Sequence, residues 1–327
     1  MAEFDLIAKL RELVGAPGPG TIVGLGDDTA VYEPPGQLEL LTCDAFVEGV
    51  HFRRDFATFE EIGAKCMVAN VSDVAAMGGS PTRAVVSVCV PPDVNDDDVL
   101  ALYRGALGVC RRNGAEIVGG DTVGSPSGLM VSVSLAGAVE RDRVLTRSGA
   151  VVGDAVIVTG AIGGSEAGLR ALVEGLTDEG LVGDAKRRHL APSARVAEAR
   201  ALIEVATPHA TIDLSDGLSS DAWHIAEESG VGVRLEADVL PLAPCAVDVG
   251  GRLGVDPLDL ALASGEEFEL LATLPEGEVE RAAEHVEAVT GTPVKRIGTV
   301  VPASDGCTLL RGGDLSPLER GGYEHLR

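Results

Sequence analysis

Apolar and polar positions in the first half of the chain follow helical and strand periods in turn. Residues 3–14 carry apolar side chains at helical spacing, which predicts an amphipathic opening helix. Apolar, alanine-rich residues at 62–77 predict a mostly buried helix, and residues 93–113 predict another whose first turn is acidic. Strands are predicted at 38–43, 83–90, 115–118 and 129–139. This mixture is typical of an α/β (α+β) domain.

A second domain of the same class follows a charged run. Residues 140–143 (ERDR) mark the change, and the boundary gives an N-terminal domain of residues 1–145 and a C-terminal α/β domain of residues 146–327. Strands are predicted at 155–159, 210–214 and 266–273, helices at 165–175 and 192–206, and a strand-helix-strand pattern up to Leu310. The alternating glutamates of 266–273 indicate one wet and one dry face. The glycine-rich turn at 160–164 is interpreted as a strand-to-helix connection, although a phosphate would also fit there.

Aspartates recur beside glycines at the predicted strand ends. Residues 24–30 (GLGDDTA), 119–122 (GGDT) and 213–217 (DLSDG) share this design, and Asp44 follows the 38–43 strand. Neighbouring carboxylates raise one another's pKa unless a cation or a donor compensates. One such turn is typical of exposed surface, but the repetition favours a site for several hard cations.

Two polar features inside apolar segments have two interpretations each. Asn70, Ser72 and Asp73 lie within the 62–77 helix, where their burial is costly unless partners satisfy them. A structural network would supply such partners, and so would a metal site reached by Asp73. His51 is flanked by apolar residues and is either a core histidine or a ligand contact.

The charge of the chain limits its partners. The 327 residues include 26 basic and 51 acidic ones, for a net charge of −25. Nucleic acid is excluded as a partner because its binding needs clusters of lysine and arginine. None of the four lysines follows a glycine, so there is no Walker A motif, and the dinucleotide fingerprint is also absent. Oxygen-only ligands favour Mg²⁺, and Mg²⁺ shared with substrate phosphates points to ATP.

The remaining composition indicates a cytoplasmic protein. The N-terminal residues are acidic where a signal peptide is basic, and no apolar run has membrane-spanning length. No C-x-x-C pair occurs, and the cysteines are expected to be buried thiols in a reducing compartment. They are Cys43, Cys66, Cys89, Cys110, Cys245 and Cys307.

Seven motifs, in order along the chain, resemble those of the thiamine-monophosphate kinases, a family within the aminoimidazole ribonucleotide (AIR) synthetase superfamily. They are residues 26–30 (GDDTA), 44–52 (DAFVEGVHF), 70–78 (NVSDVAAMG), 119–122 (GGDT), 145–149 (LTRSG), 212–218 (IDLSDGL) and 265–270 (GEEFEL). The resemblance implies two α/β domains, with the N-terminal sheets of two subunits forming a shared barrel in a homodimer. It also implies phosphorylation of thiamine monophosphate by ATP with several Mg²⁺ ions.

The resemblance also implies roles for individual residues. The magnesium ligands would be Asp28, Thr42, Cys43, Asp44, Asp73, Asp121, Asp213 and Asp216, with Cys43 acting through its backbone carbonyl. The contacts to ATP would come from Tyr103, Gly120, Asp121, Arg147 and Ser215, and those to thiamine phosphate from His51, Glu266 and Tyr323. The catalytic roles would fall to Asp44, Asp121, Arg147 and Asp216.

Two departures from the family pattern leave the aspartates intact. Cys43 stands where serine or threonine is common, and Glu267-Phe268 replaces an Asp-Tyr pair. Three alternatives remain: another ATP-dependent synthetase of the superfamily acting on a different small molecule, a selenophosphate synthetase or hydrogenase-maturation relative, and a non-catalytic scaffold. A selenophosphate synthetase would have a cysteine near the N-terminus, but none precedes Cys43, and a hydrogenase-maturation relative would end in a cysteine, but this chain ends in EHLR. A decayed scaffold would have lost aspartates that are present here.

Overall fold

A computed structural model describes residues 36–321, together with residues 9, 12–16, 18, 21–23 and 31–32. Most of the predicted opening helix, the 24–30 turn with Asp28, and Tyr323 lie outside these residues. Contacts divide the chain into two compact units: residues up to Val74 with Gly79–Asp142, and Ala75–Gly78 with the chain from Arg143 onward. No helix among the described residues is long and apolar enough to span a membrane.

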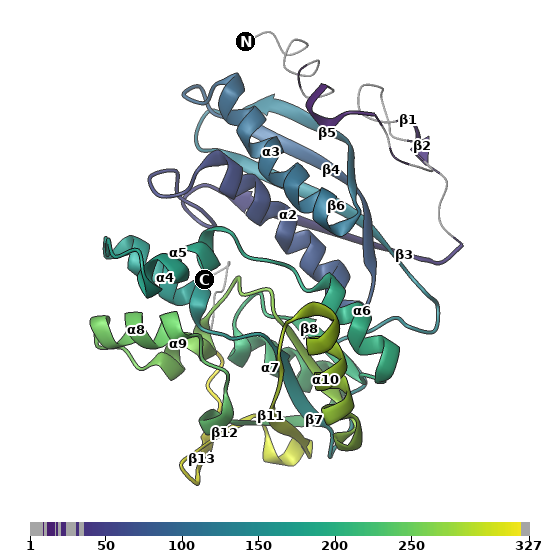
Figure 1. The fold of residues 1–327 in the computed structure, drawn as a ribbon, viewed down its shortest axis with the longest axis vertical. Helices are drawn as coiled ribbons and strands as arrows, with labels where there is room; N and C mark the ends of the chain where they lie inside the picture. Colours follow the sequence, from purple (N-terminus) through teal and green to yellow (C-terminus); the bar gives the residue numbers. More distant parts are fainter. Residues whose placement is uncertain are drawn as a thin grey trace. The chain divides into compact units, whose positions relative to one another are not determined.

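The first unit is a four-stranded sheet with two helices along one face (Figure 1). The strand order is β3-β6-β4-β5, in which only the β4–β5 pair is parallel. Its elements are β3 (Leu38–Val47), α2 (Phe59–Ala76), β4 (Ser80–Val90), α3 (Asp96–Asn113), β5 (Glu116–Gly124) and β6 (Met130–Val139), and β1 (Thr21–Val23) pairs separately with β2 (Val31–Tyr32). Each predicted strand and helix from 38 to 139 is therefore present.

Helices α2 and α3 pack backbone to backbone because glycines lie where they cross. A Cβ atom at Gly63 would lie 1.9 Å from the Leu102 carbonyl oxygen, and one at Gly105 would lie 1.9 Å from that of Glu60. Asn95 caps α3 by accepting from the N–H groups of Asp97 and Asp98. The acidic first turn of α3 thus favours the positive end of the helix dipole, as the sequence predicts.

The second unit is a seven-stranded mixed sheet with the order β13-β12-β9-β11-β7-β10-β8. Its strands are β7 (Ala155–Thr159), β8 (Ala210–Asp213), β9 (Gly232–Glu236), β10 (Leu270–Leu274), β11 (Val294–Val301), β12 (Thr308–Arg311) and β13 (Asp314–Pro317). Its helices are α4 (Gly164–Val173), α5 (Leu181–Leu190), α6 (Val196–Val205), α7 (Leu218–Ser229), α8 (Pro244–Leu253), α9 (Pro257–Ala263) and α10 (Val279–Thr290).

Alternate residues of the interior strand β7 enter two different cores. Val156 and Val158 belong to a cluster that includes Ile225 of α7, whereas Ile157 belongs to a cluster with Leu202 of α6 and Val286 of α10. Because the sheet is covered on both faces, every residue of β7 is buried. This explains why the sequence of β7 is a nearly continuous apolar run.

Four sequence predictions are corrected by the structure. Strand β3 does not end before Asp44 but runs to Val47, and β5 continues through Asp121 to Gly124. The predicted 192–206 helix begins only at Val196, and α5 before it was missed. The predicted 266–273 strand begins only at Leu270.

Candidate functional site

In the first unit, three predicted metal ligands lie together where β3 faces α2. Thr42 and Asp44 alternate along β3 and are half-buried. The Thr42 hydroxyl donates to Oδ2 of Asp73 on α2, at 2.5 Å. Burial and, second, the Asp73 charge raise the pKa of Asp44 to about 6. The Thr42 hydroxyl and the carboxylates of Asp44 and Asp73 together form an oxygen-only donor set that suits a divalent cation.

Cys43 points to the opposite face of the same strand. Its side chain is exposed, and its Sγ lies 3.6 Å from Oγ of Ser132. A contact with the Asp44–Asp73 cluster would therefore have to come from the Cys43 backbone, as the family resemblance implies. The other cysteines are buried, apart from the half-buried Cys89, so the expectation of six buried thiols fails at the exposed Cys43.

Asp121 is not brought into this cluster by the sheet. Strand β5 is the edge strand opposite β3, with β6 and β4 between them. The register pairs Asp121 with Ser87, Ser87 with Ser132 and Ser132 with Ala45, so Asp121 is one residue out of step with Asp44. Its exposed carboxylate accepts the N–H of Thr122 at 2.9 Å.

Gly120 and Tyr103 are both packed against β4. A Cβ atom at Gly120 would lie 1.9 Å from the Val86 carbonyl oxygen, so only glycine fits there. The buried Tyr103 hydroxyl donates to the same carbonyl at 3.4 Å. Burial, and then the Asp121 charge, raise the pKa of Tyr103. The Tyr103 hydroxyl is thus already hydrogen-bonded within the fold, and its contact with ATP stays a prediction.

His51 is partly exposed on the turn after β3. Its Nδ1 accepts the Val47 N–H at 3.1 Å, and its ring lies 4.9 Å from that of Phe46. Among the polar residues of α2, Asn70 donates to the Cys66 carbonyl at 3.1 Å. This bond satisfies the amide nitrogen of Asn70, whereas its buried Oδ1 has no hydrogen-bond partner within the described residues. Asp73 instead reaches the acidic cluster.

In the second unit, Asp213 and Asp216 lie where β8 passes into the turn before α7. Asp213 ends β8 and is buried, and Asp216 is half-buried three residues later. Oδ2 of Asp221 accepts the N–H groups of Asp216 and Gly217 at 3.3 and 3.1 Å and so fixes the turn. Burial, followed by the charges of Asp213 and Asp216, raises the pKa of Asp221 well above its usual range.

Arg147 contacts the C-terminal end of α7. Its side chain is exposed, and its carbonyl accepts the Ser229 hydroxyl from α7 at 3.2 Å. The pKa of His224, also on α7, is lowered by burial and then by Arg320 and Arg147, whereas Asp216 raises it. Arg147 and Asp216 therefore act with opposite signs on the same imidazole.

The loop before β10 is bound to the turn that carries Ser215. The N–H of Glu266 donates to the Ser215 carbonyl at 2.9 Å, and those of Glu267 and Phe268 donate to the Leu214 carbonyl at 3.1 and 2.9 Å. Glu266 and Phe268 have a φ of 55°, the left-handed region, and no other described residue except glycine does. The candidate substrate contact Glu266 is therefore held in register with the candidate ATP contact Ser215.

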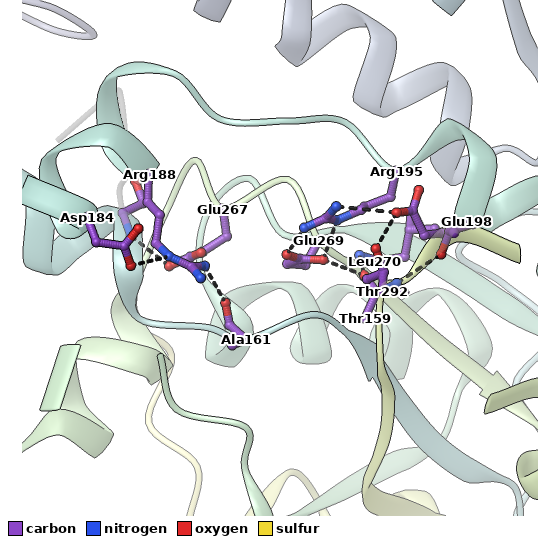
Figure 2. Close-up of polar contacts among 12 residues, drawn as sticks. Thr159, Ala161, Asp184, Arg188, Arg195, Glu198, Glu267, Glu269, Leu270 and Thr292 are labelled. Carbon is purple, nitrogen blue, oxygen red and sulfur yellow. Dashed lines mark hydrogen bonds and ion pairs between the residues drawn. The ribbon is translucent and has the colours of Figure 1, made fainter. Parts of the chain in front are cut away.

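Buried charges under this loop hold it in place (Figure 2). Arg195 donates to both oxygens of Glu269, at 2.7 and 2.5 Å, and to Glu198 at 3.3 Å. Thr159 donates to Glu269 at 2.6 Å. The glutamates were predicted to line one wet face of a strand, but Glu267 and Glu269 are both buried because the chain turns left-handed between them.

Glu267 occupies the N-terminus of α4. Its Oε1 accepts the Ser165 N–H at 2.9 Å and the Ser264 hydroxyl at 2.6 Å. Burial raises its pKa to about 7, although both hydrogen bonds oppose the shift. The position that the sequence left open for a phosphate is therefore taken by the protein's own carboxyl group.

Comparison with known proteins decides the family. The AIR synthase related protein family matches in two parts, its N-terminal domain over residues 26–139 and its C-terminal domain over residues 151–308. The thiamine-monophosphate kinase of Bacillus subtilis (strain 168) is 34% identical over 338 residues, which is 100% of both chains. This chain belongs to the thiamine-monophosphate kinase family.

Two solved structures extend this likeness to the whole fold. The thiamine-monophosphate kinase from Stenotrophomonas maltophilia K279a has a TM-score of 0.84 and 30% identity, covering 97% of this chain and 98% of that one. The structure "AaThiL complexed with AMPPCP and TMP" has a TM-score of 0.79 and 33% identity, covering 99% and 97%. The predicted two-domain α/β fold of thiamine-monophosphate kinases is confirmed.

Several residues that support the site in the second unit were not predicted from the sequence. Asp221, Arg195 and Glu269 were given no role, although each is bound to a segment that carries a predicted contact. The sequence spacing of Asp221 and His224 could have indicated that their side chains lie together, because residues three apart in a helix share one face. Arg195 had none, since its partner Glu269 is 74 residues away in sequence.

Proposed function

We propose that this chain transfers the γ-phosphoryl group of ATP directly to thiamine monophosphate and so forms thiamine diphosphate. The observation that carries the proposal is full-length similarity to a named thiamine-monophosphate kinase, at 34% identity, with every aspartate that is predicted to bind magnesium present. A relative with a TM-score of 0.79 is named as a complex with AMPPCP and TMP, an ATP analogue and the proposed acceptor.

The acidic residues would hold Mg²⁺ in two groups. Thr42, Asp44 and Asp73, with the Cys43 backbone carbonyl, form the set in the first unit; Asp213 and Asp216 belong to the second unit. Asp121 and Asp28 would add further ligands from the first unit. The raised pKa of Asp44 supports a cation there, because an opposite charge would offset the repulsion from Asp73. Bound Mg²⁺ would neutralise the phosphates during transfer.

The remaining chemistry needs orientation more than base catalysis. The nucleophile is a phosphate oxygen of thiamine monophosphate, and a phosphate monoester has a second pKa of about 6, so it is mostly ionised at neutral pH. The exposed Arg147 would add positive charge near ATP, with Gly120, Ser215 and Tyr103 as further contacts. Binding in line then lowers the barrier by fixing both polyanions.

The acceptor would be recognised by His51, Glu266 and Tyr323. The thiazolium ring of thiamine is positively charged, and the Glu266 carboxylate is held beside the 214–215 turn by the backbone hydrogen bonds of its loop. An aromatic ring such as that of Tyr323 would also favour a cation over its face. His51 would contact the acceptor from the turn after β3.

We also propose that the exposed face of the first sheet forms a homodimer interface. Leu41 is 80% exposed, and the register places Val47, Val85 and Val123 on the same face of β3, β4 and β5. An exposed group of apolar side chains on neighbouring strands is typical of a protein–protein interface. The same sheet of a second copy would bury these side chains, and the two sheets would form a shared barrel. Leu41→Glu should therefore convert a dimer into a monomer in sedimentation, whereas Val289→Glu, on exposed α10, should not.

The function is tested by asking whether ADP formation needs the acceptor. A coupled assay with ATP and excess Mg²⁺ should show ADP only after thiamine monophosphate is added. Raising Mg²⁺ above the ATP concentration should increase the rate further, because ions beyond the one on ATP are required. ADP formation without the acceptor, or a rate that saturates at one Mg²⁺ per ATP, would contradict the respective part of the proposal.

A further inference from the structure

Helix α7 and the turn before it bring together a second kind of donor set. Asp221 and His224 are three residues apart on α7 and so share one face of the helix. Asp216 adds a carboxylate from the preceding turn. One ligand atom from each of the three residues lies within 4.8 Å of the others, and no other His, Cys, Asp or Glu group among the described residues meets that criterion.

Asp221 supplies an independent sign that a ligand is missing. The residue is 1% exposed, and its Oδ2 is bound by the N–H groups of Asp216 and Gly217. Its Oδ1 is buried and has no hydrogen-bond partner within the described part of the chain. A buried carboxylate oxygen without a partner costs free energy. The neighbouring carboxylate of Asp216 increases that cost, and a bound cation would remove it.

His224 makes this donor set different from the other acidic cluster. Its imidazole is half-buried, and Nη2 of Arg320 lies 3.4 Å from its Nδ1. That contact is long, and the Arg320 guanidinium already donates two hydrogen bonds to Glu227, at 3.1 and 3.0 Å. The imidazole therefore keeps ligand capacity. Mg²⁺ prefers oxygen ligands, whereas first-row transition metals accept imidazole nitrogen.

We infer that Asp216, Asp221 and His224 bind a divalent first-row transition-metal ion, with Mn²⁺ as the probe. The carboxylate and histidine spacing on one helix is the arrangement that metal-binding helical bundles also use. Because Asp216 is also a predicted Mg²⁺ ligand, the transition metal would compete with Mg²⁺ at this turn. The inference goes beyond the proposed kinase function and does not depend on it, since it concerns binding of the metal alone.

The test uses the metal-free full-length chain with Mn²⁺ and no nucleotide. Electron paramagnetic resonance should show Mn²⁺ binding, and electron spin echo modulation should show a coordinated ¹⁴N from imidazole. His224→Gln should remove the nitrogen modulation. It should also weaken Mn²⁺ binding by at least about 10-fold, because even loss of an outer-sphere partner typically costs 10–100-fold.

Matched variants assign the signal to this site. His51→Gln should keep the nitrogen modulation, because His51 is not one of the three proposed ligands. Asp221→Asn should weaken Mn²⁺ binding as His224→Gln does, whereas Asp259→Asn, exposed on α9, should not. Wild-type protein without ¹⁴N modulation would overturn the inference whether or not the variants fold, and so would modulation that persists in His224→Gln.

Discussion

The two acidic clusters place carboxylates together by different means. In the first unit, Thr42 and Asp44 lie on a regular strand and Asp73 on a regular helix, so ordinary side-chain alternation brings them together. In the second unit, Asp213 and Asp216 lie in a turn that depends on Asp221 and on a loop with left-handed residues. The first cluster is therefore set by secondary structure, and the second by tertiary hydrogen bonds.

Because of this difference, mutations in the two clusters should affect different properties of the protein. Removing a carboxylate from the first cluster should weaken metal binding while leaving the fold intact. Removing a buried polar partner from the second should destabilise the unit itself, because a left-handed loop and a buried charge are left without support.

The largest effect is expected for Asp44→Asn. Turnover should fall by about 1,000-fold or more, since metal stabilisation of transition-state charge contributes several kcal/mol. Without Mg²⁺ the free energy of unfolding should be unchanged or higher, because the repulsion with Asp73 is removed. Asp97→Asn, exposed in the first turn of α3, is the control and should keep full activity. Normal turnover in Asp44→Asn would remove this residue from the site.

The next effect is on the stability of the second unit. Arg195→Gln should lower the free energy of unfolding by about 3 kcal/mol, because it leaves the buried Glu269 without its charged partner. Arg252→Gln removes ion pairs with Asp178 and Asp248, and because the Arg252 and Asp178 side chains are more than 40% exposed it should cost much less than Arg195→Gln. Denaturant titrations of both variants measure this. Equal losses would show that the Arg195 network has no special role.

A third effect depends on pH. The pKa of Glu267 is raised to about 7, so the folded state binds its proton more tightly than the unfolded state does. Its ionisation should therefore cost stability as the pH rises from about 4.5 to 7, by at most about 3 kcal/mol. Glu267→Gln keeps an Oε1 acceptor for Ser165 and Ser264, and it should flatten this part of the stability profile. A variant whose thermal unfolding follows the same pH dependence as wild type would contradict the assignment.

The smallest effect concerns the left-handed backbone. At Glu266 a glycine variant should be more stable than an alanine variant by about 1 kcal/mol, because a side chain costs energy at positive φ. At Asp259 in helix α9 the order should reverse by a similar amount, since glycine is the poorer helix former. Differential scanning calorimetry of the four variants measures their relative stability. If alanine were the more stable residue at both positions, the left-handed conformation of Glu266 would be contradicted.

The sequence predicts the regular parts of this molecule better than the turns. Strand β7 and helix α2 are found because their apolar patterns reflect burial directly. Asp44 and Asp121 are found as acids but placed at strand ends, because glycine beside Asp121 imitates a turn inside a strand. The loop with Glu267 and Glu269 was predicted as a strand, since only long-range partners such as Arg195 show that these glutamates are buried.

The measurement that tests the proposed function most directly is phosphorus NMR of a reaction with ATP, excess Mg²⁺ and thiamine monophosphate. Direct transfer predicts thiamine diphosphate and ADP in equal amounts with no inorganic phosphate, and none of these products with Asp44→Asn. ADP and inorganic phosphate with unchanged thiamine monophosphate would contradict the account and point to a different acceptor.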